Sequence, residues 1–433
     1  MTTLAIAGHA NLGKTTLIRT LTKLNVGIVS DRAGATQEAE PVAYPAIHAT
    51  FVDTPGLTRA SGVLVMLRHL QIDIDGLPDD YRLERVALAA VRASDVVVYV
   101  ASYEIVPSDE HRDEVSLIRS ANPRIVAILN KRKQQTIAVG KSAVANRELL
   151  WRQTLQGCGI TDIFDFDAHW DRYTKVLDLF RSCSRYLTME RQAEFTRGVT
   201  EFDQSLMKRR DAAGKLGAGT MLACRQIFEV AETEREGVDA GTLRRRLRDR
   251  VSTTVVEKLG EYASEIQSLY EMGVQTANQQ LTLAEAEIKR ASDRVASMAT
   301  HSGVGMGLGT IIGTSIGALI AGPVGAILGA KIGAGVGAGG GLTSGAIVET
   351  NSRVEVKLTD NDLREVALFC LAILWCVTHQ GFGKDATVVL ADFEEAFTHV
   401  KKEIKSIRHP DWAQCTELQR IAWFEQSLDT LDA

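Results

Sequence analysis

The stretch Gly8-His9-Ala10-Asn11-Leu12-Gly13-Lys14-Thr15 constrains the fold of this chain more than any other feature. An apolar run precedes it at residues 4–7, and residues 16–21 continue with helical spacing. Between a strand and a helix, such a turn points successive backbone N–H groups inward, and the helix N-terminus adds partial positive charge. The sequence therefore predicts a phosphate-binding loop in which Lys14 contacts the β- and γ-phosphates and Thr15 ligates Mg²⁺.

Further apolar runs predict a mainly parallel sheet behind this loop. We expect buried strands over residues 47–52, 94–100 and 124–129, separated by helical stretches. This alternation indicates right-handed βαβ crossovers, which place ligands at the carboxyl ends of the strands. Asp53 and Gly56 follow the first of these strands, where an acid can hold the Mg²⁺ shell and a backbone N–H can meet a γ-phosphate. The expected fold is a three-layer α/β domain followed by an all-α region.

These motifs resemble the translation-factor class of P-loop GTPases, and the Era/TrmE group in particular. The resemblance covers residues 1–188 and implies a GTPase that binds GTP or GDP with Mg²⁺. Four residues are implied to be catalytic: Lys14, Asn11, Thr36 and Gly56. The implied metal ligands are Thr15, Thr36 (the switch I threonine) and Asp53. The residues implied to contact the nucleotide are Gly8, His9, Ala10, Asn11, Leu12, Gly13, Lys14, Thr15, Thr16, Asn130, Lys131 and Ala168.

One departure from the family concerns the catalytic water. Leu57 follows Gly56 where many small GTPases carry a glutamine, so the resemblance implies the subgroup with a hydrophobic residue there. Asn11 stands where potassium-dependent members of the group carry an asparagine that helps to ligate K⁺. A K⁺ ion there would supply the positive charge that an arginine finger gives in other GTPases. The alternative is that the Asn11 amide only caps the loop.

A second departure concerns the base. The family motif Asn-Lys-x-Asp ends in a carboxylate that accepts from guanine N1–H and N2–H₂, whereas Lys133 holds that position here and cannot accept a hydrogen bond. The site should then lose much of its preference for guanine. The candidate final motif is 166–170. Asp167 within it, or Asp165 just before it, could partly replace the acid, and Trp170 could cover the base. Alternatively, these residues only end a strand and start a helix, with Trp170 in the core.

Residues 58–84 replace the usual short switch II helix with a longer insertion. The apolar residues 64–67 and Leu70 predict an amphipathic helix, followed by an acidic turn at 73–80. Two interpretations remain open: a partner reads the nucleotide state here, or the insertion only packs against the domain.

The carboxyl-terminal half reads as helices with no strand signal between residues 186 and 301. We expect a helical domain at 189–301, in which the basic cluster 243–250 could face anionic lipid or RNA or could be a solvated face. A C-terminal helical part is expected at 350–433. Its core helix begins near residue 360, and an amphipathic helix spans 392–405. We expect Trp412, Ile421, Trp423 and Phe424 to pack beneath the C-terminus.

Between these parts, residues 302–349 form a glycine-rich segment. Its glycines recur every fourth residue, which on a helix gives a straight line of small residues and allows another helix to approach closely. Gly322-Pro323 breaks the run, so we expect a helical hairpin with arms near the length that spans a bilayer. Membrane association through 302–348 is the favoured interpretation; an internally packed pair and a low-complexity linker are the alternatives.

Composition narrows the remaining choices. The net charge of −5 gives no general reason to expect nucleic acid as the main partner. The six cysteines are scattered without a C-x-x-C pair, which indicates reduced thiols in the cytosol rather than disulfides or a zinc site. The chain enters a strand at once, so no secretory signal is expected.

Three functions follow from these observations. The leading hypothesis is a Mg²⁺-dependent GTPase switch whose state is relayed to a membrane-associating hairpin, in the cytoplasm or at the cytoplasmic membrane. The second is a nucleotide-binding module with little hydrolysis that acts as an interaction scaffold. The third is an RNA- or ribosome-related GTPase, by analogy with the Era group. A protein partner and a homo-oligomer are left open.

Overall fold

The computed structural model describes residues 1–22, 36–167, 173–225, 228–229, 239–270, 346–350, 353–358, 360–379, 390–412 and 414–432. Two compact units divide the chain, the first containing Met1–Met207 and the second beginning at Lys208. The predicted site residue Ala168, Trp170 and most of the glycine-rich segment (302–345) lie outside the described residues.

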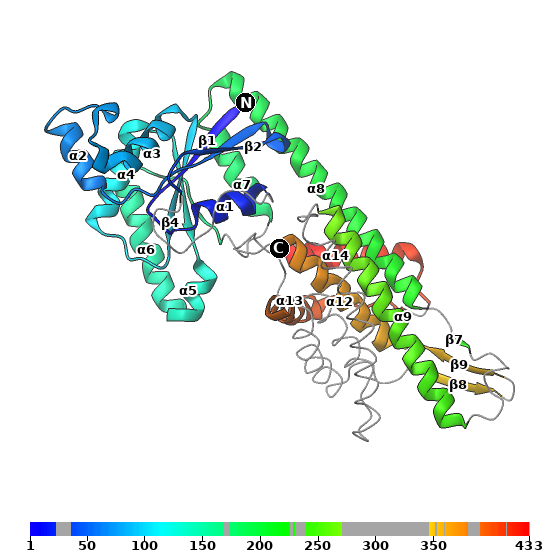
Figure 1. Ribbon diagram of the computed structural model, residues 1–433. Helices are drawn as coiled ribbons and strands as arrows, with labels where there is room; N and C mark the ends of the chain where they lie inside the picture. Colours follow the sequence, from blue (N-terminus) through cyan, green and yellow to red (C-terminus); the bar gives the residue numbers. More distant parts are fainter. Residues whose placement is uncertain are drawn as a thin grey trace. The chain divides into compact units, whose positions relative to one another are not determined.

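A six-stranded sheet with the order β2-β3-β1-β4-β5-β6 forms the centre of the first unit (Figure 1). All neighbouring strands in it run parallel except β2, which is antiparallel to β3. The strands are β1 (Thr2–Ala7), β2 (Glu40–Tyr44), β3 (Ala49–Asp53), β4 (Val96–Ser102), β5 (Ile125–Asn130) and β6 (Ile163–Asp165).

Helices cover both faces of this sheet and give the three layers that the sequence predicts. The helices are α1 (Lys14–Thr22), α2 (Ala60–Arg68), α3 (Arg82–Ala93), α4 (Asp109–Ala121), α5 (Arg132–Val139), α6 (Lys141–Gly157) and α7 (Tyr173–Ser184), with 3₁₀ turns η1 (Pro45–Ile47), η2 (Ile74–Gly76) and η3 (Asp79–Tyr81). Alternate residues of β1 enter different cores: Leu4 and Ile6 pack with α1 and α7, whereas Ala5 and Ala7 pack with α3, α4 and α6. This period of two is that of a buried strand, so the α/β prediction is confirmed.

Two details of the first unit differ from the sequence prediction. The antiparallel strand β2 was not expected, because residues up to Pro41 read as a polar loop. The expected strand over 47–52 begins later, at Ala49, because Pro45 starts the 3₁₀ turn η1 and His48 takes a left-handed conformation with φ of 52°. A proline at the first position of a turn has its φ already fixed for it.

The second unit is mainly helical, as predicted. Its helices are α8 (Met189–Cys224, which begins in the first unit), α9 (Ala240–Leu269), α12 (Asp360–His379), α13 (Leu390–Glu403) and α14 (Glu417–Asp432), with the 3₁₀ turn η5 (Ile404–Ser406). Helix α9 buries Val255, Leu259 and Tyr262, and Trp412, Trp423 and Phe424 are buried in the same core. The basic cluster 243–250 lies on α9.

A small sheet in this unit corrects the all-helical prediction. It has the order β7-β9-β8 and consists of β7 (Phe228–Glu229), β8 (Ala346–Thr350) and β9 (Arg353–Lys357). β8 therefore occupies the last residues of the segment 302–349 that was expected to be a helical hairpin. In the register of this sheet Ile347 lies opposite Val356 of β9. A pairing between two segments cannot be read from the pattern of either one alone.

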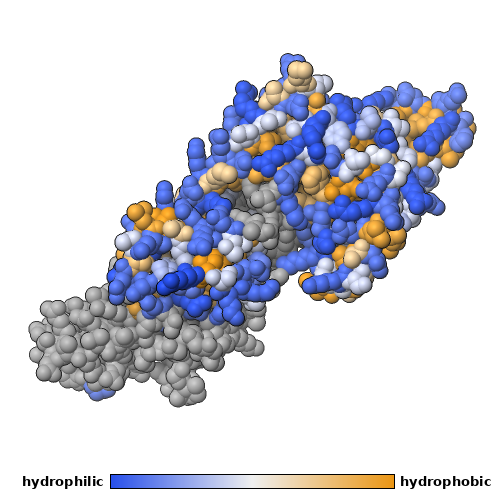
Figure 2. Space-filling model, turned by 180° about the vertical axis from the view of Figure 1, so that it is seen from behind, coloured by the Kyte–Doolittle hydropathy of each residue, from blue (hydrophilic) through white to orange (hydrophobic). Residues whose placement is uncertain are grey.

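Helix α12 is the strongly apolar helix of the second unit. Val366, Leu371 and Val377 are at most 3% exposed, so the prediction of a core helix is confirmed. Among the described residues, no helix combines the length and apolar character needed to cross a membrane. On the face shown in Figure 2, hydrophilic and hydrophobic side chains of the described residues are interspersed.

Candidate nucleotide-binding site

The predicted phosphate loop connects β1 to α1 at the carboxyl edge of the sheet. Gly8 has φ of 143°, and a Cβ there would lie 2.5 Å from the Val100 carbonyl oxygen. Gly13 has φ of 89°, and a Cβ there would lie 2.8 Å from Asn130 Nδ2. Both positions combine a left-handed backbone with a close approach, so only glycine fits. Asn11 is also left-handed, with φ of 63°, a conformation that asparagine tolerates better than most residues.

Lys14 begins α1, and its ammonium group turns back over the loop. Nζ donates to the carbonyl oxygens of Gly8, at 3.1 Å, and His9, at 2.7 Å. The side chain is buried, and burial lowers the pKa of Lys14, while the carboxylates of Asp53 and Glu114 act in the opposite direction. A desolvated cation held by two backbone carbonyl oxygens is well suited to bind an anionic phosphate.

The predicted metal ligands lie together next to Lys14. Thr15 Oγ1 donates to Asp53 Oδ2 at 2.6 Å, and Thr36 Oγ1 donates to the same oxygen at 3.4 Å. Asp53 is 3% exposed, and its Oδ1 is buried with no hydrogen-bond partner. Burial raises the pKa of Asp53, and the hydrogen bond from Thr15 opposes this shift. Three oxygen-bearing side chains from α1, the polar loop and β3 thus converge on one point.

Gly56 brings the chain after β3 against the phosphate loop. A Cβ on Gly56 would lie 2.6 Å from the Cα and 2.7 Å from the backbone N of Ala10. The next residue, Leu57, donates its N–H to the Gly8 carbonyl oxygen at 3.3 Å, and its side chain is 1% exposed in the core beneath α3. The Leu57 side chain therefore belongs to the core.

A residue that the sequence analysis missed holds the start of this segment. Glu84, on α3, is 2% exposed, and its Oε1 accepts from the N–H groups of Thr58, at 3.3 Å, and Arg59, at 3.1 Å. The Thr58 hydroxyl donates to the same oxygen at 3.2 Å. A single buried carboxylate thus fixes the chain two residues after Gly56.

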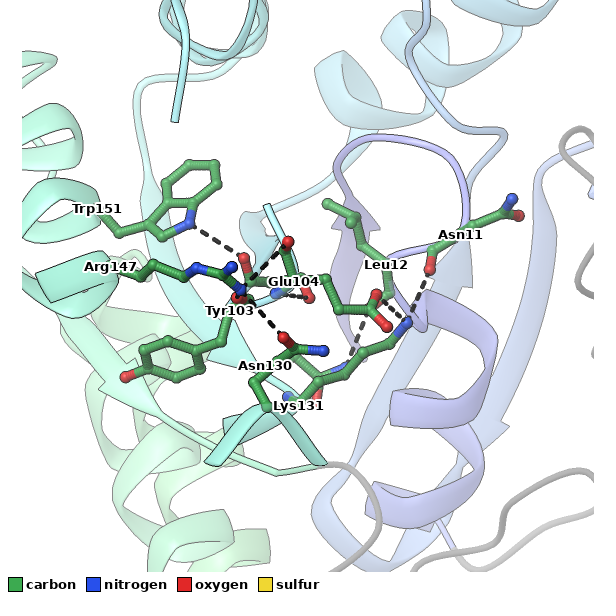
Figure 3. Close-up of polar contacts among 10 residues, drawn as sticks. Asn11, Leu12, Tyr103, Glu104, Asn130, Lys131, Arg147 and Trp151 are labelled. Atoms are coloured by element: carbon green, nitrogen blue, oxygen red, sulfur yellow. Dashed lines mark hydrogen bonds and ion pairs between the residues drawn. The ribbon is translucent and has the colours of Figure 1, made fainter. Parts of the chain in front are cut away.

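Asn130 and Lys131 connect the end of β5 to the phosphate loop (Figure 3). Asn130 Nδ2 donates to the Leu12 carbonyl oxygen at 2.9 Å, and its Oδ1 accepts from the Lys131 N–H at 2.8 Å. Lys131 is left-handed, with φ of 67°, and its Nζ donates to the Asn11 carbonyl oxygen at 3.2 Å and to Glu104 Oε2 at 2.5 Å. The two predicted base-motif residues and the loop therefore form one connected network.

Asp165 and Asp167, the two acidic candidates for the base site, have different hydrogen-bond partners near Lys133. Asp165, at the end of β6, pairs with the Arg132 guanidinium. Asp167 instead accepts the Lys133 backbone N–H on Oδ2 at 2.9 Å and is 8% exposed. Asp167 thus lies at the first turn of α5, beside the position where the family motif carries its carboxylate.

A second buried acid lies behind the phosphate loop and was also missed. His9 Nδ1 donates to Oε2 of Glu114, on α4, at 3.2 Å. Glu114 is fully buried, and burial raises its pKa. The hydrogen bond to Glu114 raises the pKa of His9, and burial opposes that shift. The His111 ring lies near that of His9, with centroids 5.8 Å apart and the two planes tilted by 48°.

The structure therefore brings most of the predicted site residues to one edge of the sheet. Gly8 to Thr15, Thr36, Asp53, Gly56, Asn130 and Lys131 are linked by the contacts above, and Thr16 follows in the first turn of α1. The set that could hold a metal consists of oxygen donors; among the described residues, no cluster of His, Cys, Asp or Glu has the form of a separate metal site.

Comparison with known proteins agrees with this geometry. Residues 3–131 match the family model described as 50S ribosome-binding GTPase. GTPase Der of Helicobacter hepaticus is 26% identical over 133 residues, which is 30% of this chain and 24% of that protein. GTPase Era of Geotalea daltonii is 25% identical over 129 residues, 29% of this chain and 38% of that protein. The chain thus spans well under half the length of either relative.

A crystal structure of Era in complex with MgGDPNP and nucleotides 1506–1542 of 16S ribosomal RNA is 20% identical. The region that the two structures share covers 43% of this chain and 57% of the Era chain, with a TM-score of 0.31. The family match, the curated relatives and the sheet with its phosphate loop lead to one assignment. The amino-terminal part of the chain is a P-loop GTPase domain of the Era-like type.

Proposed function

We propose that the protein binds GTP and GDP with Mg²⁺ and hydrolyses GTP as a molecular switch. The observation that carries this proposal is the convergence of Thr15 and Thr36 on Asp53, next to the buried Lys14. In this proposal residues 1–188 are the nucleotide domain, and the parts at 189–301, 302–349 and 350–433 respond to its state.

The residues present fit a Mg²⁺ ion. Magnesium prefers oxygen ligands, and the two threonine hydroxyls and the Asp53 carboxylate supply them. The buried Oδ1 of Asp53 has no hydrogen-bond partner, and such an oxygen is costly unless a cation or water satisfies it. When bound, the ion would neutralise charge on the β- and γ-phosphate oxygens.

Backbone and lysine groups bind the phosphates in this mechanism. The N–H groups of the loop and of the first turn of α1 face the anion, and the helix N-terminus favours negative charge. Lys14 Nζ, now on the carbonyl oxygens of Gly8 and His9, contacts the β- and γ-phosphates. The Gly56 N–H and the Thr36 hydroxyl contact the γ-phosphate side and distinguish GTP from GDP.

Hydrolysis then depends on a group other than residue 57. Because the Leu57 side chain is buried, it cannot orient the attacking water. We propose that a K⁺ ion beside Asn11 supplies positive charge to the transition state. Turnover in K⁺ should exceed turnover in Na⁺ at equal ionic strength, and Asn11→Ala should remove that difference. Equal rates in the two salts would contradict the role of K⁺.

Isothermal calorimetry on the full chain tests nucleotide binding. GTP and GDP should each bind with Mg²⁺, and Lys14→Ala should weaken binding about 10- to 100-fold through loss of charge-assisted contacts. Lys208→Ala, which removes an exposed lysine of α8, is the matched control and should bind normally. No heat with either nucleotide, or wild-type hydrolysis by Lys14→Ala, would refute the proposal.

A ribosomal partner is a second candidate, and it replaces the expectation that nucleic acid is disfavoured. The matching family model is described as ribosome-binding, and a compared Era structure contains 16S ribosomal RNA. Co-sedimentation with ribosomal subunits in GDP and in a non-hydrolysable GTP analogue tests this candidate. Sedimentation that is equal with and without subunits would remove it.

Membrane association of residues 302–348 stays a proposal that rests on the four-residue glycine period alone. Flotation with liposomes, for the full chain and for a variant that lacks 302–345, tests it. Full-length protein that stays at the bottom of the gradient with either nucleotide would refute it.

A further inference from the structure

The proposed site needs a group that recognises the base. Guanine presents two adjacent donors, N1–H and N2–H₂, beside the acceptor O6, and an ionised carboxylate can accept from both donors at once. Lys133 carries only donors on its side chain. If the site reads guanine, the acceptor must therefore come from another residue near α5.

Three carboxylates lie at or just after the ends of β4 and β6, the two strands that flank β5, and their contacts differ. Glu104 accepts the Lys131 ammonium at 2.5 Å, and Asp165 pairs with the Arg132 guanidinium. Asp167 accepts a backbone N–H, that of Lys133, at 2.9 Å. Glu104 and Asp165 thus each pair with a cationic side chain, and Asp167 is bonded to the backbone of α5 at Lys133.

The position of Asp167 follows from this bond. Asp167 Oδ2 accepts a hydrogen bond directly from the backbone N–H of Lys133, the residue at the acidic position of the base motif. The carboxylate therefore reaches the first turn of α5 from the segment after β6, close to the place that a side chain at position 133 would start from. The side chain is also more than nine-tenths buried, at 8% exposure, as a specificity group usually is.

We propose that Asp167 is the specificity-determining residue for the base, accepting from N1–H and N2–H₂ of guanine in place of the carboxylate missing at Lys133. In this arrangement the acid has moved from α5 to the neighbouring segment after β6, and Lys133 contributes its backbone N–H. The inference rests on the proposed nucleotide binding by the same site.

Substitution of Asp167 should change which base is preferred. Xanthine carries an oxygen at C2 where guanine carries an amino group, so the amide donor of Asp167→Asn matches xanthine and opposes guanine. We expect GDP affinity to fall about 10- to 100-fold and the GDP-to-XDP preference to reverse. Asp165→Asn, two residues away and paired with Arg132, is the matched control and should keep the preference for GDP.

A rescue variant tests the relocation itself. The double variant Lys133→Asp/Asp167→Asn returns a carboxylate to α5 and should regain the preference for GDP over XDP. If the double variant loses its preference for GDP to the same extent as Asp167→Asn alone, the two positions do not share one function.

The wild-type protein gives a measurement that does not depend on any variant folding. Its affinities should rank GDP above IDP, which lacks the 2-amino donor, and IDP above XDP. A preference for XDP would mean that the Lys133 ammonium reads the base, and would overturn the inference. An unchanged GDP-to-XDP ratio in Asp167→Asn would overturn it as well. Absence of all nucleotide binding by the wild-type protein would instead refute the proposed function.

Discussion

Replacement of Asn130 by alanine tests the connection between β5 and the phosphate loop. The Asn130 side chain is 1% exposed; it donates to the Leu12 carbonyl oxygen and accepts from the Lys131 N–H. The first bond holds the loop, and the second fixes the left-handed conformation of Lys131. Alanine removes both bonds and leaves the two backbone groups without these partners.

The expected cost follows from the surroundings of each group. The Leu12 carbonyl lies in a buried bond, so leaving it unpaired should cost about 1–3 kcal/mol. The Lys131 N–H is only partly buried, so water can replace the lost acceptor, and the net loss should be about 0.5–1.5 kcal/mol. Together, Asn130→Ala should lower the unfolding free energy of the first unit by about 1.5–4.5 kcal/mol.

Amide hydrogen exchange of β4 and β5 in the nucleotide-free chain measures this quantity, because core strands exchange through opening of the whole unit. Asn122→Ala is the matched control: Asn122 is equally buried and donates to the Val91 and Ser94 carbonyl oxygens, away from the loop. Both variants should lose stability, but only Asn130→Ala should also lose GDP affinity. The reasoning fails if Asn130→Ala exchanges like wild type, or if both variants lose affinity equally.

Three more predictions address the neighbouring contacts. Gly56→Ala places a Cβ 2.6 Å from the Cα of Ala10, so overpacking should lower the unfolding free energy by about 1–3 kcal/mol. The affinity for GTP should fall more than the affinity for GDP, and an equal fall of the two in calorimetry would contradict this prediction. Because the hydrogen bond to Glu114 raises the pKa of His9 above 6.5, His9→Gln should destabilise the unit most below that pH, and the loss should disappear as the pH rises through the raised pKa. A destabilisation that stays constant between about pH 6 and about pH 9 would argue against this linkage. Glu84→Gln keeps a hydrogen-bond acceptor but loses the charge, so it should speed hydrogen exchange of the backbone just before α2, and unchanged exchange there would remove its anchoring role.

The sequence predicted the phosphate side of the site because that part is local. Gly8, Lys14 and Thr15 lie within one turn, so spacing along the chain determines how they meet. Thr36 and Asp53 required the parallel topology in addition, and the βαβ rules supplied it. The base side depends on whether β5 and β6 end side by side, and sequence spacing alone left the choice between Asp165 and Asp167 open.

The two missed acids carry a signal that helical periodicity contains. Glu84 precedes Leu88 and Val91 by four and seven residues, so it occupies the buried stripe of α3. Glu114 adjoins Val115 and lies three residues after the buried His111, on the buried face of α4. An acid at an apolar position of a helix is costly unless it is paired, so each could have been identified as a buried anchor. The partners of Glu84 could not be identified, because backbone N–H groups leave no mark in a sequence. The partner of Glu114 could not be identified either, because His9 lies 105 positions away along the chain.

Four of the described strands were missed by the sequence analysis, and three of them lie at an edge of their sheet. β2 pairs with β3, whereas β7 and β8 both pair with the central strand β9, which was also missed. β7 and β9 are far apart along the chain, so a pattern within either short segment cannot specify their pairing. An edge strand has only one neighbour in its sheet, which weakens the continuous apolar run that identified β1 and β4.

Helix α4 connects the two segments that are proposed to contact the phosphates. Its Glu114 holds His9 of the loop, while Asp113 accepts from Ser61 of α2 at 2.6 Å and Leu117 packs with Leu64 of the same helix. The insertion after Gly56 is therefore a packed part of the domain, whatever partner it also binds. Residues 113 and 114 of this one helix therefore contact both α2 and the phosphate loop. A shift of α2 on loss of the γ-phosphate would then act on the loop through α4. Variants at Asp113 should accordingly change the rate of GDP release, although Asp113 does not contact the nucleotide.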